Sequence, residues 1–305
     1  MTRRIPAAEK QAAKAIKPLL AINESRHTNK HDSKVHSVGT ARQYESTYKG
    51  VAKWLSENHN ERLRYITPEQ ATAYLNERSC DIKQKQLNNE RRALELHLRH
   101  VQKAPELTLA RLRSEVPDIE HSRAYTQDQI ELVQSEQSDN MALSTALAST
   151  AGLRAEELLT LQRIDERAPS GHRAWSDDRY QGRENWHRYT VQGKGGLVRE
   201  VRFPEALAKR LEARRLDNPE RVTDRGVNHK KVYDVVGGKS FSNMFSRDSI
   251  QHLGWSEGAH GLRHSYAQQR MDELQNSGQH YRAALGTVSQ ELGHFRPDIT
   301  EVYLR

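Results

Sequence analysis

The stretch Leu292-Gly293-His294-Phe295-Arg296-Pro297-Asp298-Ile299-Thr300-Glu301-Val302-Tyr303 is the most informative part of this sequence. It places a tyrosine nine residues after a histidine that follows a glycine. An imidazole donates hydrogen bonds or moves protons near neutral pH. A phenol can become a covalent carrier, as serine or cysteine does in other enzymes. The stretch therefore contains a candidate nucleophile and a candidate proton carrier.

Two earlier stretches add cationic groups to this pair. Arg154 ends the stretch Ala151-Gly152-Leu153-Arg154, and Arg263 ends His260-Gly261-Leu262-Arg263. Guanidinium groups match phosphate oxygens in a bidentate manner. A phenol, two guanidiniums and two imidazoles can together attack a phosphodiester bond and stabilise the charge that develops on it.

A lysine lies on a glycine-rich turn, Gly193-Lys194-Gly195-Gly196, between two runs typical of strands, 186–192 and 197–203. A lysine on such a turn can approach a bound substrate, and its pKa shifts readily on desolvation. In the second run apolar residues alternate with charged ones, which predicts an apolar face and an exposed polar face. The apolar residues of this alternation are Val198, Val201 and Phe203, and the charged ones are Arg199, Glu200 and Arg202.

The net charge of +8 is distributed unevenly along the 305 residues. Residues 1–120 contain 22 Lys and Arg against 15 Asp and Glu, a net charge of +7, whereas residues 121–305 contain 26 against 25, a net charge of +1. A positive first part favours contact with a phosphate backbone. An ordinary solvated basic surface is the alternative.

Several classes of protein are excluded. Cys80 is the only cysteine, so no intramolecular disulfide can form, which fits a reducing compartment. No apolar run approaches the ~18 residues of a membrane span, and the N-terminus lacks an apolar signal core. We therefore expect a cytoplasmic, nucleoid-associated protein with no membrane partner.

The length allows about two domains. Residues 1–38 predict a basic helix over 5–22 followed by a polar linker, and residues 39–104 predict a small helical bundle. Residues 105–122 predict a linker, and residues 123–305 a larger domain. The expected fold is mainly α with a small antiparallel β-sheet.

Local signals predict where several helices begin. Thr40 is a candidate N-cap, and two capping boxes are present in Thr67-Pro68-Glu69-Gln70 and Thr126-Gln127-Asp128-Gln129. Helical periodicity predicts further helices over 82–102, 127–136, 140–151, 155–161 and 205–215, and from about 240 to the end, with breaks at Gly254, Gly278 and Gly293.

These stretches resemble the conserved boxes of the tyrosine recombinases, the phage-integrase family. Residues 151–158 resemble its first arginine box, and residues 260–267 resemble its second, a His-x-x-Arg that opens a helix. Residues 292–294 with Tyr303 resemble the third. The turn at Lys194, followed by Arg199 and Pro204, is similar to the family's lysine turn, and all parts occur in the family's order over roughly residues 39–305.

The resemblance implies a helical core-binding domain at 39–104 and a mixed α/β catalytic domain at 123–305. It implies that Tyr303 attacks phosphorus and forms a 3′-phosphotyrosyl bond, while Arg154 and Arg263 hold the non-bridging oxygens. An ordinary ion pair is the alternative role for Arg154.

Further roles follow from the same resemblance. His260 would accept the tyrosine proton or bridge to the phosphate, and His294 would donate a hydrogen bond to an oxygen. Lys194 would protonate the leaving 5′ oxygen, or else only contact a phosphate. Glu157, three residues after Arg154, would orient that arginine or be a plain surface carboxylate. His264 and Tyr266 are expected to be structural.

No cofactor and no metal are expected. Gly237-Gly238-Lys239-Ser240 ends like a phosphate-binding loop, but Tyr233 occupies the position that requires glycine. The fifteen histidines contain no His-Glu-x-x-His pair. ATP is also unnecessary, because the energy of the broken bond is kept in the phosphotyrosine.

The sequence therefore predicts a site-specific DNA recombinase, an integrase or resolvase of a mobile element. Its expected partners are double-stranded DNA at specific sites, three further copies in a tetramer that passes through a Holliday junction, and accessory DNA-bending proteins. The alternatives are a type IB topoisomerase and a non-catalytic DNA-binding accessory protein.

Two departures from the family pattern concern assembly. The sequence has more residues than usual between Arg263 and His294, near 276–279, and only two residues after Tyr303. Many family members carry a longer tail that docks on a neighbouring protomer. Three explanations are therefore left open: another element couples the protomers, the protomers assemble weakly, or the sequence is truncated.

Overall fold

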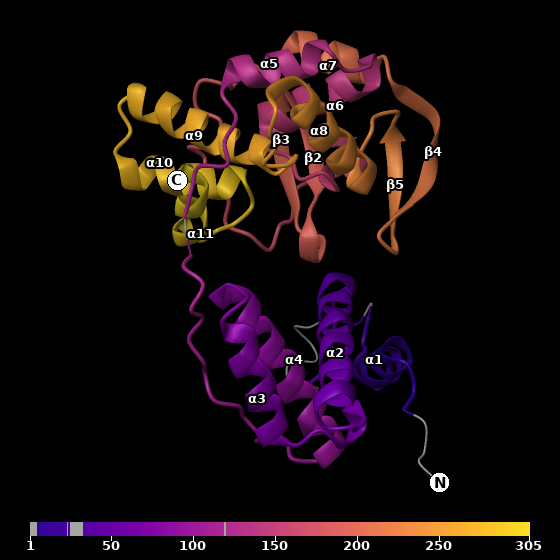
Figure 1. The fold of residues 1–305 in the computed structure, drawn as a ribbon. Helices are drawn as coiled ribbons and strands as arrows, with labels where there is room; N and C mark the ends of the chain where they lie inside the picture. The colour runs from indigo at the N-terminus through magenta and orange to yellow at the C-terminus, as the bar shows by residue number, and fades with distance from the viewer. Residues whose placement is uncertain (1–4, 23, 25–32, 119) are drawn as a thin grey trace. The chain divides into compact units, whose positions relative to one another are not determined.

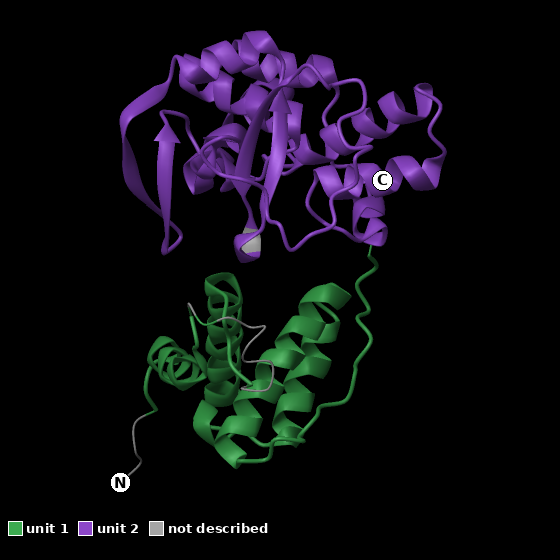
Figure 2. Cartoon of the chain, turned by 180° about the vertical axis from the view of Figure 1, so that it is seen from behind, with its two compact units in different colours: residues 1–119 green, residues 120–305 purple. Residues whose placement is uncertain are grey.

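The computed structural model describes residues 5–22, 24, 33–118 and 120–305, except for the side chain of Lys194. The chain divides into two compact units, residues 1–119 and residues 120–305 (Figure 2). The division falls within 105–122, the stretch expected to be a linker.

Unit 1 is helical (Figure 1). Its helices are α1 (Ala8–Ile16), α2 (Val38–Asn58), α3 (Pro68–Ser79) and α4 (Gln84–Gln102), with short 3₁₀ turns at Lys17–Leu19 and Leu63–Tyr65. Helix α1 packs on α2, and its Ala12 and Ile16 join the core of the unit. The apolar stripe of α1, which lies within the basic helix expected over 5–22, therefore contributes to the same core as the helical bundle.

The capping signals are mostly confirmed. Thr67 and Gln70 form a reciprocal capping box, with Thr67 Oγ1 accepting from the Gln70 N–H at 3.2 Å and Gln70 Oε1 accepting from the Thr67 N–H at 3.0 Å. Thr126 and Gln129 form the same arrangement at the start of α5. The prediction for Thr40 was wrong, because α2 already begins at Val38 and Thr40 lies within its first turn.

Unit 2 combines helices with a three-stranded antiparallel sheet in the order β1-β2-β3. The strands are β1 (Gln162–Arg163), β2 (His187–Gln192) and β3 (Val198–Phe203). The helices are α5 (Gln127–Ser135), α6 (Asp139–Ala151), α7 (Glu205–Glu212), α8 (Gly238–Leu253), α9 (Gly261–Asn276), α10 (Tyr281–Glu291) and α11 (Pro297–Glu301). The predicted fold class, mainly α with a small antiparallel sheet, is confirmed.

Helix α6 is the central element of unit 2. It contacts α5, α7, α8, α9 and β3, and it is buried on most sides. Its apolar residues therefore lie in one large core with β2, β3 and α8. A second core cluster joins α9 and α10 to Tyr303, so the predicted nucleophile is anchored by packing against those two helices.

Three local predictions need correction. The helix expected over 155–161 is a single 3₁₀ turn, Glu157–Thr160, and the helix expected to reach 215 ends at Glu212. A long antiparallel hairpin, β4 (Arg215–Asp224) and β5 (Val227–Tyr233), was not foreseen. Strand β4 is largely exposed and has an irregular register between Arg215 and Glu220, so it lacks the alternation that identifies a strand from sequence.

The alternation predicted for β3 was also wrong. Arg199 and Glu200, two charged residues of this alternation, are both buried. Glu200 is compensated by hydrogen bonds from Arg188 and Arg202. Arg199 is compensated by Glu157. Burial of these charges was possible because partners from other elements meet them, which periodicity cannot reveal.

The capping box of α5 gives a test of this local analysis. Thr126→Ala removes the acceptor for the Gln129 N–H, so it should lower the free energy of unfolding by about 1 kcal/mol. Gln127→Ala, which removes only an exposed contact with Glu131, is the control and should change it by less than about 0.5 kcal/mol. Urea unfolding followed by tryptophan fluorescence measures both, and equal effects would contradict the assignment.

Candidate active site

Gly152 determines where Arg154 lies. It ends α6 in the left-handed conformation, with φ at +56°, and a Cβ there would lie 2.7 Å from the Tyr266 ring. Glycine is therefore required both by the backbone and by the packing. The turn it makes leads the chain through buried Leu153 to Arg154, whose side chain keeps 28% of its surface exposed.

Glu157 lies directly beneath Arg154 and is fully buried. Its Oε1 accepts a hydrogen bond from Arg154 Nη1 at 2.7 Å, and its Oε2 accepts one from the Arg154 backbone N–H at 2.9 Å. Burial alone would raise the pKa of Glu157, but the charges of Arg199, Arg154 and Arg263 outweigh it and hold that pKa well below its usual range. Glu157 is thus an ionised carboxylate that fixes Arg154 from two sides.

Arg263 is placed by the first turn of α9 and has no exposed surface. Its guanidinium donates to the carbonyl oxygens of Gly152 and Leu292, which belong to the ends of α6 and α10. The carboxylate of Glu157 lies 4.0 Å away. Burial and the neighbouring charge of Arg154 lower the pKa of Arg263 to about 9, so it remains cationic at neutral pH.

His294 contacts Arg263 directly. Arg263 Nη2 lies 3.1 Å from His294 Nε2, and His294 Nδ1 lies 3.2 Å from Thr300 Oγ1. Because a guanidinium can only donate, Nε2 accepts, and in the neutral ring the proton lies on Nδ1 and is donated to Thr300. Burial and the charges of Arg263 and Arg154 lower the pKa of His294 to about 3, so this neutral tautomer prevails near pH 7.

Tyr303 lies in a 3₁₀ turn, Val302–Leu304, with 8% of its surface exposed. Its hydroxyl is 3.2 Å from His260 Nε2. Its ring lies 4.5 Å from the ring of His264 and 5.1 Å from that of His294, between centroids. The Arg263 guanidinium lies 5.7 Å from the centre of the tyrosine ring. The phenol, the imidazoles and a buried cation therefore meet in one place.

His260 precedes α9 and is an exposed residue beside this tyrosine. Partial burial of its ring, together with the charge of Arg263, lowers its pKa well below the ordinary value. A neutral imidazole has one unprotonated nitrogen, so His260 Nε2 can accept a proton from the Tyr303 hydroxyl.

The turn that carries Lys194 reaches the same place through Gly193. A Cβ on Gly193 would lie 2.8 Å from Glu157 Oε1 and 3.4 Å from Arg154 Nη1. The backbone of the β2–β3 turn therefore lies against the Arg154–Glu157 pair. The backbone of Lys194 follows in the 3₁₀ turn Lys194–Gly196, while its side chain is outside the described part of the structure.

Arg199 is the site residue that the sequence analysis missed. It is 2% exposed, and its Nη2 donates to Glu157 Oε2 at 2.8 Å. The only signal for it in the sequence was its fixed place after the lysine turn. Of the two residues expected to be structural, Tyr266 is buried and donates to Glu291 at 2.7 Å, and His264 packs on the Tyr303 ring.

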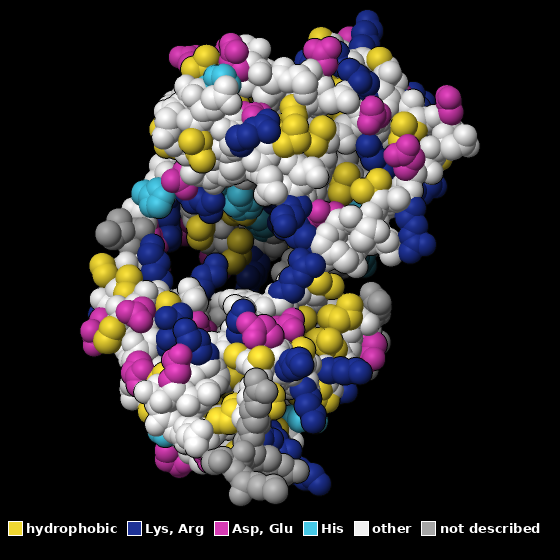
Figure 3. All heavy atoms as spheres, turned by 45° about the vertical axis from the view of Figure 1, so that its right-hand side comes forward, with side chains coloured by type: hydrophobic (Ala, Val, Ile, Leu, Met, Phe, Trp, Pro, Cys, Tyr) yellow, Lys and Arg dark blue, Asp and Glu magenta, His cyan; other side chains and the backbone are white. Residues whose placement is uncertain are grey.

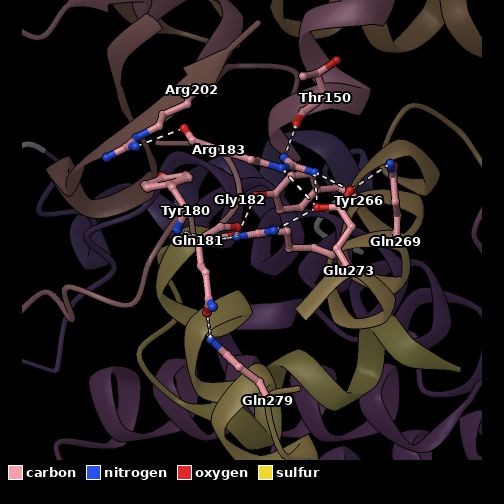
Figure 4. A network of polar contacts seen from close by, with 12 residues as sticks. Thr150, Tyr180, Gln181, Gly182, Arg183, Arg202, Tyr266, Gln269, Glu273 and Gln279 are labelled. Atoms are coloured by element: carbon pink, nitrogen blue, oxygen red, sulfur yellow. Dashed lines mark hydrogen bonds and ion pairs between the residues drawn. The ribbon is translucent and has the colours of Figure 1, made fainter. Parts of the chain in front are cut away.

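A buried ionic network supports the stretch that carries His294. Glu291, at the end of α10, accepts hydrogen bonds from Tyr266, Arg270 and the Tyr180 backbone N–H. Figure 4 shows the adjoining part, in which Arg183 lies between the Thr150 carbonyl and Glu273. The network ties α9, α10 and the irregular segment before β2 together, so the ends of these elements are held rigidly.

Neither a metal-ligand cluster nor a membrane-spanning helix is found among the described residues. Among them, no group of three or more His, Cys, Asp or Glu side chains is placed to hold a metal ion. None of their helices is both long and apolar enough to cross a membrane.

Comparison with known proteins identifies the fold through structure alone. No protein-family model and no curated protein matches the sequence. The solved structure of XerH site-specific recombinase bound to difH substrate, a pre-cleavage complex, is 14% identical, with a TM-score of 0.59, over 100% of this chain and 95% of that one. A lambda integrase dimer bound to a COC′ core site is 16% identical, with a TM-score of 0.57, over 92% and 93%.

A third solved structure, the Tn1549 transposon integrase with transposon right end DNA, is 14% identical, with a TM-score of 0.51, over 98% of this chain and 95% of that one. The chain has the tyrosine-recombinase fold. The fold thus agrees with the resemblance of the sequence boxes, although identity is low throughout.

The lowered pKa values of His294 and His260 can be tested by titration. The His294 and His260 rings should stay neutral from about pH 8 to about pH 5.5, because their pKa values lie below the ordinary 6.5. Imidazole ¹⁵N shifts measured against pH report this, with His294→Gln and His260→Gln assigning the signals. A midpoint near 6.5 for either ring would contradict the proposed environment.

The lowered pKa of His294 makes the stability of the folded chain depend on pH. The unfolded chain binds the His294 proton near pH 6.5, whereas the folded chain binds it near pH 3. Acidification between these values therefore favours unfolding through this group. The loss of stability on acidification in this range should be smaller in His294→Gln than in the original protein, as measured by thermal unfolding.

Proposed function

We propose that the chain is a site-specific DNA recombinase, an integrase or resolvase of a mobile element, that cuts and rejoins DNA through a 3′-phosphotyrosyl intermediate. The observation that carries this proposal is the position of the Tyr303 hydroxyl. It lies 3.2 Å from a neutral imidazole nitrogen of His260 and beside the buried Arg263. A phenol next to both a proton acceptor and fixed positive charge is a competent nucleophile toward phosphorus.

In the proposed cleavage step, the site residues supply and accept every proton that moves. The Tyr303 oxygen bonds to phosphorus as its proton passes to His260, and the bond from phosphorus to the 5′ oxygen breaks. Lys194 supplies a proton to that leaving oxygen. The phosphotyrosyl ester retains the energy of the broken bond, so a 5′ hydroxyl of another strand can reverse the step without ATP or metal.

Arg154 and Arg263 would stabilise the charge that develops on the non-bridging oxygens. Arg154 is the more exposed of the two and is fixed by Glu157, so its guanidinium can meet a phosphate with little reorganisation. Arg263 contributes positive charge from a position without solvent, where screening is weak.

His294 requires a proton shift before it can donate to a phosphate oxygen. In the structure its Nε2 accepts a hydrogen bond from Arg263. A phosphate anion beside the ring would raise the pKa of His294, and protonation would turn Nε2 into a donor. DNA binding would thus convert His294 from an acceptor of the Arg263 hydrogen bond into a donor to the substrate.

Recognition of double-stranded DNA would involve both units. Lys and Arg side chains are spread over the visible surfaces of both (Figure 3). In unit 1 an open groove of about 870 Å³ lies between α2, α3 and α4. Its lining includes the cations Lys83 and Lys85, the amides Gln43, Gln86 and Asn89, and Arg78 paired with Glu90. Cations of this kind contact phosphates, and amide side chains can contact base edges.

Assembly is proposed by analogy with a solved structure. A lambda integrase tetramer bound to a Holliday junction is 16% identical to this chain, with a TM-score of 0.56, over 92% of this chain and 75% of that one. We propose that four copies of this protein act on two DNA sites in the same way, with accessory DNA-bending proteins at some sites, in the cytoplasm with the nucleoid.

The direct test uses the nucleophile. A nicked suicide substrate built from the DNA that flanks the gene should yield a covalent protein–DNA adduct, and Tyr303→Phe should reduce it at least ~1,000-fold while binding persists. Tyr281→Phe, an exposed tyrosine at the start of α10, is the control and should retain adduct formation. An adduct that persists in Tyr303→Phe would disprove the assignment.

Assays with the same protein distinguish the two alternative functions from recombination. A type IB topoisomerase would relax supercoiled plasmid that lacks cognate sites, whereas a recombinase should require them. A non-catalytic accessory protein would bind the flanking DNA and form no adduct.

A further inference from the structure

We propose that Arg199 is a positioning residue for strand cleavage: it holds the carboxylate of Glu157 in place and, through it, the guanidinium of Arg154. This inference rests on the proposed function. Arg199 has almost no exposed surface, so it cannot itself reach DNA, and any effect on cleavage must pass through its neighbours.

The first contact is with the carboxylate. Glu157 presents Oε1 to Arg154 Nη1 at 2.7 Å and Oε2 to Arg199 Nη2 at 2.8 Å. One carboxylate therefore bridges a buried guanidinium and a partly exposed one. Without Arg199, the Oε2 atom would keep only the Arg154 backbone N–H as a hydrogen-bond partner, and the side chain of Glu157 could rotate.

The second set of contacts is with helix ends. Arg199 Nη1 donates to the Glu291 carbonyl at 2.6 Å, and Nη2 also lies 3.3 Å from the Gly152 carbonyl. These oxygens belong to the last turns of α10 and α6, which have no partner within their own helices. The approach is close, since a Cβ on Gly293 would lie 3.1 Å from Arg199 Cδ. Arg199 thus joins the stretches that carry Arg154 and His294.

The charges facing Glu157 come from three elements: Arg154 from the turn after α6, Arg199 from β3 and Arg263 from α9. His294 is the nearby titratable group, and the side chain of Lys194 is not described. Removal of Arg199 leaves two cations to balance the buried carboxylate, so the pKa of Glu157 should rise. A protonated Glu157 would hold Arg154 less firmly.

Arg167 provides a control, because it is a hydrogen-bonded guanidinium in the same unit, although it is less deeply buried than Arg199. It donates to Thr190 Oγ1 at 3.0 Å and to the carbonyls of Thr160 and Thr190, and it has no hydrogen bond to a predicted site residue among the described residues. Arg167→Met should therefore reduce stability without altering the site.

The experiment compares Arg199→Met, Arg199→Lys and Arg167→Met in the full-length protein on the suicide substrate. Arg199→Met should slow cleavage roughly 10- to 100-fold, because small displacements of a catalytic group have effects of this size. DNA affinity should change by less than about twofold, and the acidic limb of the pH–rate profile should move to higher pH. Arg199→Lys should recover part of the rate, since it restores the charge but not the fork.

One result would overturn the proposal that Arg199 positions Glu157. If Arg199→Met and Arg199→Lys slow cleavage no more than Arg167→Met at equal loss of stability, with the acidic limb unmoved, Arg199 is only a structural residue. If Arg199→Met does not fold, Arg199→Lys carries the same comparison.

A second measurement distinguishes failure of the Arg199 proposal from failure of the proposed recombinase function. A ¹³C titration of the Glu157 carboxyl, assigned with Glu157→Gln, needs no DNA. A higher pKa in Arg199→Met than in the original protein supports the proposal even if neither forms an adduct, and an unchanged pKa overturns it.

Discussion

The carboxylate of Glu157 is buried among three guanidinium groups, and the arrangement of the whole site depends on this balance of charge. A buried carboxylate is strongly unfavourable unless it is paired, and closely spaced guanidiniums repel one another unless an anion lies between them. The carboxylate therefore stabilises the guanidinium groups, and the guanidinium groups stabilise the carboxylate. The result is a cluster of fixed positive charge with one member, Arg154, partly exposed to a ligand.

The second constraint is the partial burial of the imidazoles beside the guanidinium groups. His294 is kept neutral by burial and by the nearby guanidiniums, and the same factors act on His260. Neutral rings can accept protons, and this is the state that the attack by a tyrosine requires. In the proposed mechanism the cations would serve two purposes: they would stabilise an incoming phosphate, and they lower the pKa values of the neighbouring imidazoles.

Much of this site could be predicted from spacing. Arg154, His260, Arg263, His294 and Tyr303 all come within one region of unit 2, as their boxes indicated, and both capping boxes form as expected. The hairpin of β4 and β5 and the burial of Arg199 were not predicted. A strand without alternation and a charged residue on an apparently polar face carry no local signal of their true environment.

The sequence by itself determined the residue types, the order of the boxes and the two helix starts marked by capping boxes, because a capping box depends on contacts within a few residues. Only the tertiary structure decided which charges meet. Arg199 reaches Glu157 across 42 positions, and Arg263 reaches the Gly152 carbonyl across 111. Such pairs form because buried charges and unpaired helix-end carbonyls must find partners wherever the fold brings them, and no pattern along the chain records that requirement.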